Sequence, residues 1–294
     1  MFLRYSSFPS FALFCLTIAL FSSTALAGDD WKPLDPADLA SKTPVVEKDA
    51  DAEALFWEVR VDDGEADELV FTHYVRVKVF TERGKESQSK IDLPYRATYR
   101  ITDIAARTVK ADGTIVELKK EDVFERTLLK ANGLKVKAKS FAIPAVEPGA
   151  IVEYRWKEIR GGRSANYVQL QFQRDIPVRL LTYLVRPYSG PYAKGLSYRP
   201  FHMPDGLRFE KVKDGFYRAQ LANVAAFHDE PRMPPEDEVR SWILLYYSSD
   251  QKIAPDRYWT DLGKRIWQSP AIVRIFFWTA LLPTPIFWSH PLLP

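Results

Sequence analysis

Hydrophobic and polar residues alternate with a period of two along several segments of the chain. The segment 75–79 reads Val-Arg-Val-Lys-Val, and the same alternation recurs at 58–61 and 168–173. Successive side chains of a β-strand point to opposite faces, so this pattern predicts strands with one buried face and one solvated face. Such strands are typical of antiparallel sheets, which commonly leave one face in water.

Turn signals separate these segments. Asp112-Gly113 and Asp214-Gly215 each lie between two apolar segments and predict two-residue hairpin turns, in which both central residues have positive φ. Pro148-Gly149 predicts a type II turn. Arg83-Gly84 and Gly161-Gly162 predict two further strand ends. Many short strands separated by turns predict a β-sandwich or a barrel.

The remaining segments predict loops, one more strand and a helix. Residues 186–206 are rich in Pro, Gly and Tyr and predict long surface loops, and the prolines of 228–238 predict another loop. An apolar strand is expected at 241–247. Residues 256–267 predict a short C-terminal helix, because apolar residues recur at every fourth position on one face.

The N-terminus is typical of a secretory signal peptide, residues 1–27. Arg4 supplies a positive charge, residues 11–21 are apolar, and Ala25-Leu26-Ala27 is a small-residue cleavage site. The apolar segment is too short to span a bilayer as a helix, and the alternative is an uncleaved anchor. We therefore expect a secreted protein, periplasmic or extracellular, whose mature form begins at Gly28.

The mature chain is expected to have four parts. Residues 28–52 predict an extended lead-in with one helical turn at 36–39, and residues 53–247 predict the β-sandwich domain. Residues 248–268 predict a linker and the helix. Residues 269–294 form an atypical hydrophobic tail without Asp or Glu, in which prolines interrupt clusters of Phe, Trp and Leu. We expect this tail to contribute nothing to the fold.

Charge and cysteine content limit the classes of function. The net charge of +3 over 294 residues is close to balance and favours no nucleic-acid partner. The single cysteine, Cys15, lies in the signal segment, so the mature chain lacks a thiol. No G-x-S-x-G motif occurs, and His73, His202, His228 and His290 lack metal-ligand spacing. We therefore expect no catalytic residue, no metal, no cofactor and no stable membrane span.

Aromatic residues in the Pro-rich loop segment are the candidate binding residues. Flat rings suit peptide or sugar binding, because they offer contact area at low cost in entropy. The alternative is that these rings fold back over the sandwich. The residues are Tyr188, Tyr192, Tyr198 and Phe201.

Two charged segments are weaker candidates. Lys135, Lys137 and Lys139 predict one basic strand face, which either binds an anionic polymer or, as we favour, blunts edge-to-edge pairing. His228 beside Asp229 and further acidic residues suits a cation, but the spacing of a calcium loop is missing. We favour a solvated loop there.

Four segments, in order, resemble one known family. Residues 140–154 read Ser-Phe-Ala-Ile-Pro-Ala-Val-Glu-Pro-Gly-Ala-Ile-Val-Glu-Tyr, 172–178 read Phe-Gln-Arg-Asp-Ile-Pro-Val, 230–235 read Glu-Pro-Arg-Met-Pro-Pro, and 242–247 are apolar. They are similar to the domain of unknown function numbered 3857, the N-terminal module of bacterial secreted transglutaminase-like proteins. The motif residues, which we interpret as structural, are Phe141, Pro144, Pro148, Gly149, Tyr154, Gln173, Pro177, Glu230, Pro231 and Pro234.

The resemblance implies an antiparallel, immunoglobulin-like β-sandwich. It also implies a following papain-like transglutaminase domain with a Cys-His-Asp triad, and no such triad can be carried over to this sequence. Our hypothesis is a truncation or frameshift near Gln268. The alternative is a genuine short relative with a hydrophobic tail.

The sequence thus predicts a mainly β, non-catalytic module that supports a transglutaminase-like domain or binds envelope peptides or glycans. Three alternatives remain. The chain is a fragment of a transglutaminase-like cysteine peptidase whose catalytic domain is lost, a hydrolase with an unrecognised carboxylate site, or a surface adhesion or carbohydrate-binding module.

Overall fold

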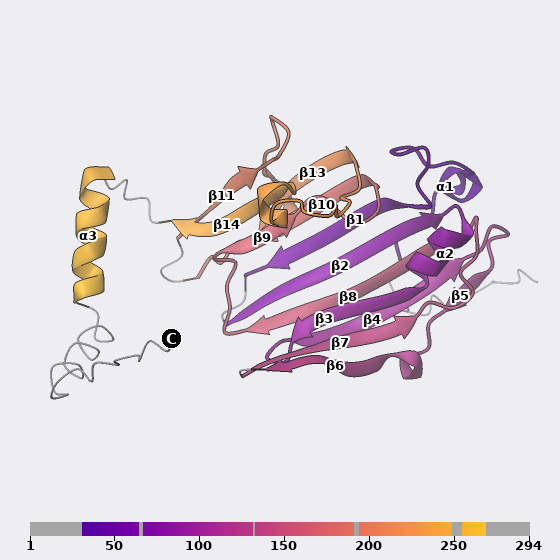
Figure 1. Ribbon diagram of the computed structural model, residues 1–294, viewed down its shortest axis with the longest axis horizontal. Coiled ribbons are helices and arrows are strands. Elements are labelled where there is room, and N and C mark those ends of the chain that lie inside the picture. Colours follow the sequence, from indigo (N-terminus) through magenta and orange to yellow (C-terminus); the bar gives the residue numbers. More distant parts are fainter. Residues whose placement is uncertain (1–30, 65–66, 132, 191–193, 249–254, 269–294) are drawn as a thin grey trace, which may run out of the picture. The chain divides into compact units, whose positions relative to one another are not determined.

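The computed structural model describes residues 31–64, 67–131, 133–190, 194–248 and 255–268 (Figure 1). The chain divides into two units, Met1–Asp35 and Pro36–Pro294. The described residues of the first unit, 31–35, have no regular secondary structure. The elements below all belong to the second unit. The predicted signal peptide and the hydrophobic tail lie outside the described residues.

One sheet holds eight of the strands. Its order is β12-β13-β10-β1-β2-β8-β4-β5. Neighbouring strands are antiparallel except β1 and β10, which are parallel. The strands are β1 (Ala52–Asp62), β2 (Glu68–Val79), β4 (Arg100–Val109), β5 (Ile115–Glu117), β8 (Ile151–Gly161), β10 (Val178–Arg186), β12 (Glu210–Lys211) and β13 (Tyr217–Val224).

Two smaller antiparallel sheets complete the β-structure. Their orders are β11-β14-β9 and β3-β7-β6. The strands are β3 (Lys90–Arg96), β6 (Phe124–Ala131), β7 (Leu134–Ala142), β9 (Val168–Gln171), β11 (Gly195–Phe201) and β14 (Trp242–Ser248). The expected mainly β, predominantly antiparallel and sandwich-like class is confirmed.

Three α-helices are short. α1 (Pro36–Ala40) is the expected turn in the lead-in, and α3 (Pro255–Trp267) is the expected C-terminal helix, whereas α2 (Glu82–Gln88) was not expected. Single turns of 3₁₀ type occur among the described residues at Lys120–Asp122 and Glu236–Glu238, whereas Lys213–Gly215 is non-helical at Asp214 and belongs to a hairpin turn. None of the helices among the described residues combines the length and apolar character that crossing a bilayer requires.

The inner face of the eight-stranded sheet carries the core. Val75 of β2 lies opposite Trp57 of β1 and Tyr154 of β8, so these three side chains share one face. Val75 and Val77 are fully buried, and Leu170 of the β11-β14-β9 sheet belongs to the same cluster. The alternation of residues 75–79 therefore predicted the apolar core face correctly, but the expected solvated face was wrong there, because Arg76 and Lys78 are also buried.

The opposite face of this sheet carries a buried ionic cluster. Glu153 of β8 is fully buried and accepts hydrogen bonds from Tyr74 Oη at 2.8 Å and Arg76 Nε at 2.7 Å. Arg107 of β4 pairs with the same carboxylate at 2.6 Å. A buried carboxylate is tolerated where cations and hydrogen bonds satisfy it, and this one connects three neighbouring strands.

A second buried carboxylate fixes the lead-in segment. Glu53 of β1 is fully buried and accepts the backbone N–H groups of Val45 and Val46 at 2.8 and 2.7 Å. Its side chain also pairs with Arg179 of β10, which in turn pairs with Asp38 of α1 at 3.0 Å. Glu53 is therefore a central attachment of residues 36–50, beside the bonds from Lys78 Nζ to Leu39 O at 2.7 Å and from Ala226 N to Glu47 Oε1 at 2.8 Å.

Two of the predicted turns are confirmed. Asp214 and Gly215 both have positive φ, 58° and 75°, as a two-residue hairpin turn requires. Gly149 has a φ of 89°, and Ala150 N donates to Glu147 O at 3.0 Å. This is the type II turn expected from Pro148-Gly149.

The Asp112-Gly113 prediction needs a correction. The hairpin exists and joins β4 to β5, but its loop is longer, because Lys110 N donates to Thr114 O at 2.9 Å. Gly113 has a φ of 85°, whereas Asp112 is not among the residues with positive φ. The turn is therefore a three-residue loop with one left-handed glycine.

Arg83-Gly84 does not mark a strand end, because both residues lie in α2. The Thr81 side chain caps this helix by accepting the Gly84 N–H at 3.1 Å. A Cβ atom at Gly84 would lie 2.1 Å from Asp51 O. The glycine allows the helix to approach the backbone before β1, which is why a residue interpreted as a breaker is found inside a helix. Gly161 does end β8, as expected.

Two further predictions are corrected. Residues 186–206 are not all loop, because 195–201 form β11; this is an edge strand, where Pro200 is tolerated. The lysine-rich strand β7 is central in its sheet, so it has no free edge to blunt. Lys137 and Lys139 instead pair with Glu125 of β6, at 2.5 and 3.1 Å.

Candidate functional site: an aromatic cleft between two edge strands

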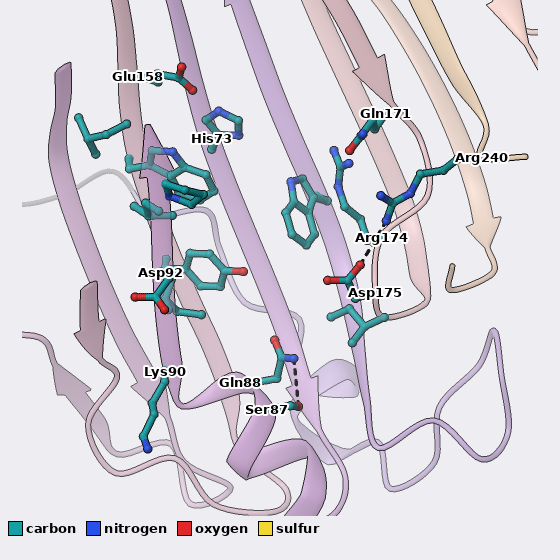
Figure 2. A pocket seen from close by; sticks show the side chains of 18 residues that line it. His73, Ser87, Gln88, Lys90, Asp92, Glu158, Gln171, Arg174, Asp175 and Arg240 are labelled. Carbon is teal, nitrogen blue, oxygen red and sulfur yellow. Dashed lines mark hydrogen bonds and ion pairs between the residues drawn. The ribbon is translucent and has the colours of Figure 1, made fainter. Parts of the chain in front are cut away.

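A cleft lies over the inner face of the eight-stranded sheet. One hollow of about 480 Å³ is lined by residues of β1, β2, β3, β8 and the segment after β9, and an adjoining hollow of about 710 Å³ continues along β9. We call the two hollows the aromatic cleft. Figure 2 shows Arg174, Asp175 and Arg240 on one side of it and Lys90 and Asp92 on the other. Both hollows are lined by Trp57, His73, Trp156, Glu158, Gln171 and Arg174.

The cleft is flanked by edge strands of the two small sheets. β3 is at one edge of the β3-β7-β6 sheet, and β9 is at one edge of the β11-β14-β9 sheet. Leu170 lies opposite Ile243, and Phe172 N donates to Ser241 O at 2.8 Å. Because hydrogen-bonded positions alternate along an antiparallel ladder, the backbone groups of Gln169 point away from β14.

Stacked rings form the floor of the cleft. His73 of β2 lies opposite Trp156 of β8 in the ladder. Their ring centroids are 4.1 Å apart and the rings are parallel within 1°. Phe71 and Tyr154 extend the row, at 6.3 Å from His73 and 5.7 Å from Trp156. The floor is therefore a rigid row of four rings that lie face to face with one another, and Phe71, Tyr154 and Trp156 in it are buried.

His73 is neutral in this environment. Burial, followed by the positive charges of Arg174 and Arg160, lowers the pKa of His73 to about 3. The Nε2 atom is buried and has no hydrogen-bond partner among the described residues. A neutral imidazole there can donate or accept one hydrogen bond but carries no charge at neutral pH.

Arg174 and Trp57 form the side of the cleft next to β9. The guanidinium carbon of Arg174 lies 4.8 Å from the centre of the Trp57 ring. Arg174 also donates to Tyr183 Oη at 2.8 Å, and Tyr183 Oη donates to Gln171 O at 2.6 Å. These contacts fix the guanidinium against a flat ring, a favourable cation–π geometry.

The other guanidinium groups of the cleft are paired with carboxylates. Arg160 pairs with Glu158 at 2.7 Å. Arg240 pairs with Asp175 at 3.2 Å and with Glu236 at 2.7 Å. Acidic and basic groups are thus interspersed, and no large field of one sign is built up.

The residues predicted as binding candidates lie elsewhere and do not form one site. Tyr188 and Tyr198 line a separate hollow of about 390 Å³, in which Tyr198 contacts Phe209 edge-on at 5.0 Å. Phe201 instead stacks on Trp242 at 4.1 Å. Tyr192 lies outside the described residues. For Phe201, the alternative of a ring folded back on the sheet is the one observed.

The motif residues have structural positions. Phe141 and Tyr154 are buried in the core. Pro144 O accepts the Thr108 hydroxyl at 2.6 Å, and Gln173 Oε1 accepts Ser241 N at 3.0 Å. Pro177 O accepts Ala54 N at 2.9 Å. Glu230, Pro231 and Pro234 lie in the loop before β14, where Met233 N donates to Glu230 O at 3.2 Å.

The acidic loop after β13 does not gather a metal site. Within the part of the chain that the structure describes, no three His, Cys, Asp or Glu side chains are close enough together to hold an ion. His228 and Asp229 are exposed.

Fold and cleft together define a mainly β protein with a ligand-sized cleft between sheets. The chain belongs to the family described as "Domain of Unknown Function with solved-structure structure (DUF3857)", whose family model matches residues 65–227. This is the family that the sequence motifs resemble. No curated protein is significantly similar to the chain.

Several solved structures are similar to this chain at low sequence identity. A protein described as a "putative protease" from Parabacteroides distasonis has a TM-score of 0.54 and 19% identity; the match covers 67% of this chain and 40% of that one. Yeast LTA4 hydrolase (TM-score 0.35, 9% identity, 67% and 29% covered) and an M1 zinc metallopeptidase mutant from Deinococcus radiodurans (0.31, 10%, 70% and 45%) are more distant. The first match shows a common fold, and this chain covers 40% of that protein's length.

Proposed function

We propose that this chain is a non-catalytic binding module that holds an extended peptide segment in the aromatic cleft. The observation that supports this most is the position of two edge strands, β3 and β9, on either side of a cleft with a row of stacked rings at its floor. An edge strand offers free backbone N–H and C=O groups to one further strand. The rings beneath offer contact area to its side chains.

The state of His73 favours binding over catalysis. A nucleophile and its base must lie within hydrogen-bond reach of each other. Among the described residues, no side chain is hydrogen-bonded to His73 Nε2, and the low pKa keeps the ring uncharged. The ring is held flat on Trp156, which suits a binding surface.

β9 is the better of the two edges for pairing with a peptide. On β3, Ser89 O accepts Ile143 N, so the alternation places Lys90, Asp92 and Pro94 with their backbone groups away from β7. Pro94 has no N–H and interrupts that edge. On β9, Gln169 keeps both its N–H and C=O, and we propose that the peptide pairs there.

A direct test uses an uncharged extended peptide, acetyl-Thr-Val-Thr-Val-Thr-amide, titrated into the ¹⁵N-labelled chain. We expect shifts at the Gln169 amide and at the Trp57 indole N–H, assigned with Gln169→Ala and Trp57→Phe. Gln169→Pro removes the outward N–H and should abolish binding. Gln169→Ala keeps the N–H and should preserve binding.

A glycan serves as the competing ligand. If a tetramer of N-acetylglucosamine shifts the Trp57 indole and the peptide does not, the module binds sugars and the peptide proposal fails. Equal binding by Gln169→Pro and Gln169→Ala would show that strand pairing does not hold the peptide.

A second role, supporting a transglutaminase-like domain, is favoured by the family motifs and by a fold match that covers 40% of a longer protein. The nucleotide sequence after codon 268, read in all three frames, tests this role. A Cys-His-Asp domain encoded there would support it. We also propose that the protein acts after export; an N-terminus at Met1 instead of Gly28 in the exported form would contradict this.

A further inference from the structure

The side chain of Arg174 has an unusual combination of contacts. Its guanidinium carbon lies 4.8 Å from the centre of the Trp57 ring, and the group donates hydrogen bonds to Tyr183 Oη at 2.8 Å and, at the longer distance of 3.4 Å, to Gln173 O. Its Nε atom is buried and has no hydrogen-bond partner among the described residues. No described carboxylate lies within ion-pair distance of it, whereas Arg160 and Arg240 in the same cleft both have one.

A second donor next to it is in the same state. The indole Nε1 of Trp57 is buried and has no partner among the described residues. Indole and guanidinium N–H groups only donate, so both need an acceptor. Buried donors are almost always paired in folded proteins, and those that are not indicate a place where a ligand or solvent atom belongs.

The charges around Arg174 indicate what kind of acceptor fits. Glu158 and Asp175 line the cleft and are held by Arg160 and Arg240. Among the described guanidinium groups that line the cleft, Arg174 is the one without a carboxylate partner, which suits a ligand group with a single negative charge and planar oxygens. A carboxylate meets guanidinium N–H groups in this way. A dianionic phosphate would be repelled by the acidic groups nearby.

We propose that Arg174, with the Trp57 indole N–H, binds a carboxylate group of the peptide held in the aromatic cleft. This rests on the proposed peptide-binding function and specifies its ligand as an acidic peptide. The carboxylate is supplied either by the C-terminus of the peptide or by an Asp or Glu side chain.

Three pentapeptides that differ in one group test this. They are acetyl-Thr-Val-Thr-Val-Thr-amide, the same peptide with a free C-terminal carboxylate, and acetyl-Thr-Val-Glu-Val-Thr-amide. Binding to the full chain is measured by calorimetry and by the shift of the Trp57 indole resonance. We expect at least one acidic peptide to bind about tenfold more tightly than the amide, as a charge-assisted hydrogen bond in a cleft predicts. The tighter of the two identifies the source of the carboxylate.

Matched variants separate charge from folding. Arg174→Gln should bring the acid-to-amide affinity ratio to about one, and Arg174→Lys, which keeps the charge, should retain part of the preference. Arg100→Gln removes a guanidinium that pairs with Glu68 outside the cleft and should leave the ratio unchanged. Circular dichroism of each variant confirms that the fold is intact.

The outcomes distinguish the two proposals. If all three peptides bind equally, or if Arg174→Gln keeps the preference, the carboxylate site is wrong while the peptide-binding function stands. If none of the three binds, both fail. If inorganic phosphate displaces the acidic peptide at an equal concentration, Arg174 is a general anion site and the carboxylate assignment is overturned.

Discussion

Replacing Gly84 by alanine sets two physical effects against each other. In an exposed helix, Gly→Ala stabilises by about 1 kcal/mol, because alanine loses less backbone entropy. In α2 the new Cβ would lie 2.1 Å from Asp51 O and 2.8 Å from the Asp51 carbonyl carbon. The helix and the backbone before β1 must therefore move apart by roughly 1 Å to reach an ordinary contact distance.

The cost of overpacking at Gly84 is larger than the gain in helix propensity. Overpacking of this kind costs about 1–3 kcal/mol. The displaced Asp51 O also accepts Phe80 N at 2.9 Å and Thr81 N at 3.3 Å, and weakening one such bond costs about 0.5–1.5 kcal/mol. After subtraction of the helix-propensity gain, Gly84→Ala should lower the free energy of unfolding by about 1–3 kcal/mol. For a domain of this size the melting temperature should fall by roughly 2–12 °C.

Urea denaturation followed by circular dichroism measures this difference. Gly263→Ala in α3 is the matched control, because no atom lies within 4 Å of the position of its new Cβ. That variant should be as stable as the parent or slightly more stable. If Gly84→Ala is also as stable as the parent, α2 does not approach the strand closely, and the reasoning from the 2.1 Å contact is refuted.

Three further predictions follow from buried or constrained groups. The pKa of His73 is about 3 in the folded chain and 6.5 in an ordinary histidine, so between these pH values the unfolded chain binds more protons than the folded chain. The free energy of unfolding should therefore fall as the pH drops below 6.5. His73→Phe should make this free energy depend less on pH, as measured by urea denaturation at pH 4 to 7. Gly149→Val should lower the melting temperature clearly, because the φ of 89° at this position strains a β-branched residue. As a control, Lys137→Ala removes a partly exposed ion pair and should change the free energy of unfolding by less than about 1 kcal/mol. Glu53→Gln should cost about 1–3 kcal/mol, because it weakens the bonds to Val45 N and Val46 N while Arg179 keeps its pair with Asp38. It should also speed proteolysis within 41–50, and unchanged cleavage would show that the other contacts suffice to hold this segment.

The alternation of residues predicted the faces of the long strands because one face is buried against a common core. The same alternation also indicates one residue of the cleft. His73 is in phase with Val75 and Val77, so the alternation places a polar ring on the apolar, buried face. A polar side chain at such a position needs a partner or a function.

No local pattern in the sequence predicts that Arg174 and Trp57 are in contact. Arg174 belongs to a motif after β9, and Trp57 belongs to β1. They meet because β9 pairs with β14 and because both small sheets contribute to the same core. Single-sequence periodicity reports which face of a strand is buried, but it says nothing about which strands become neighbours. α2 was missed for a different reason: its glycine was interpreted as a breaker, although Thr81 is a good N-cap residue.

The parallel pairing of β1 with β10 bears on how the protein folds. β1 and β2 can pair as a hairpin as soon as both have left the ribosome, but the other edge of β1 stays open until residues 178–186 have been made. Until then, an edge that presents Trp57 and Val59 is available to other chains. Such non-local closure slows folding. Chains stalled before residue 178 should therefore aggregate or bind chaperones, and completion of β10 should release them.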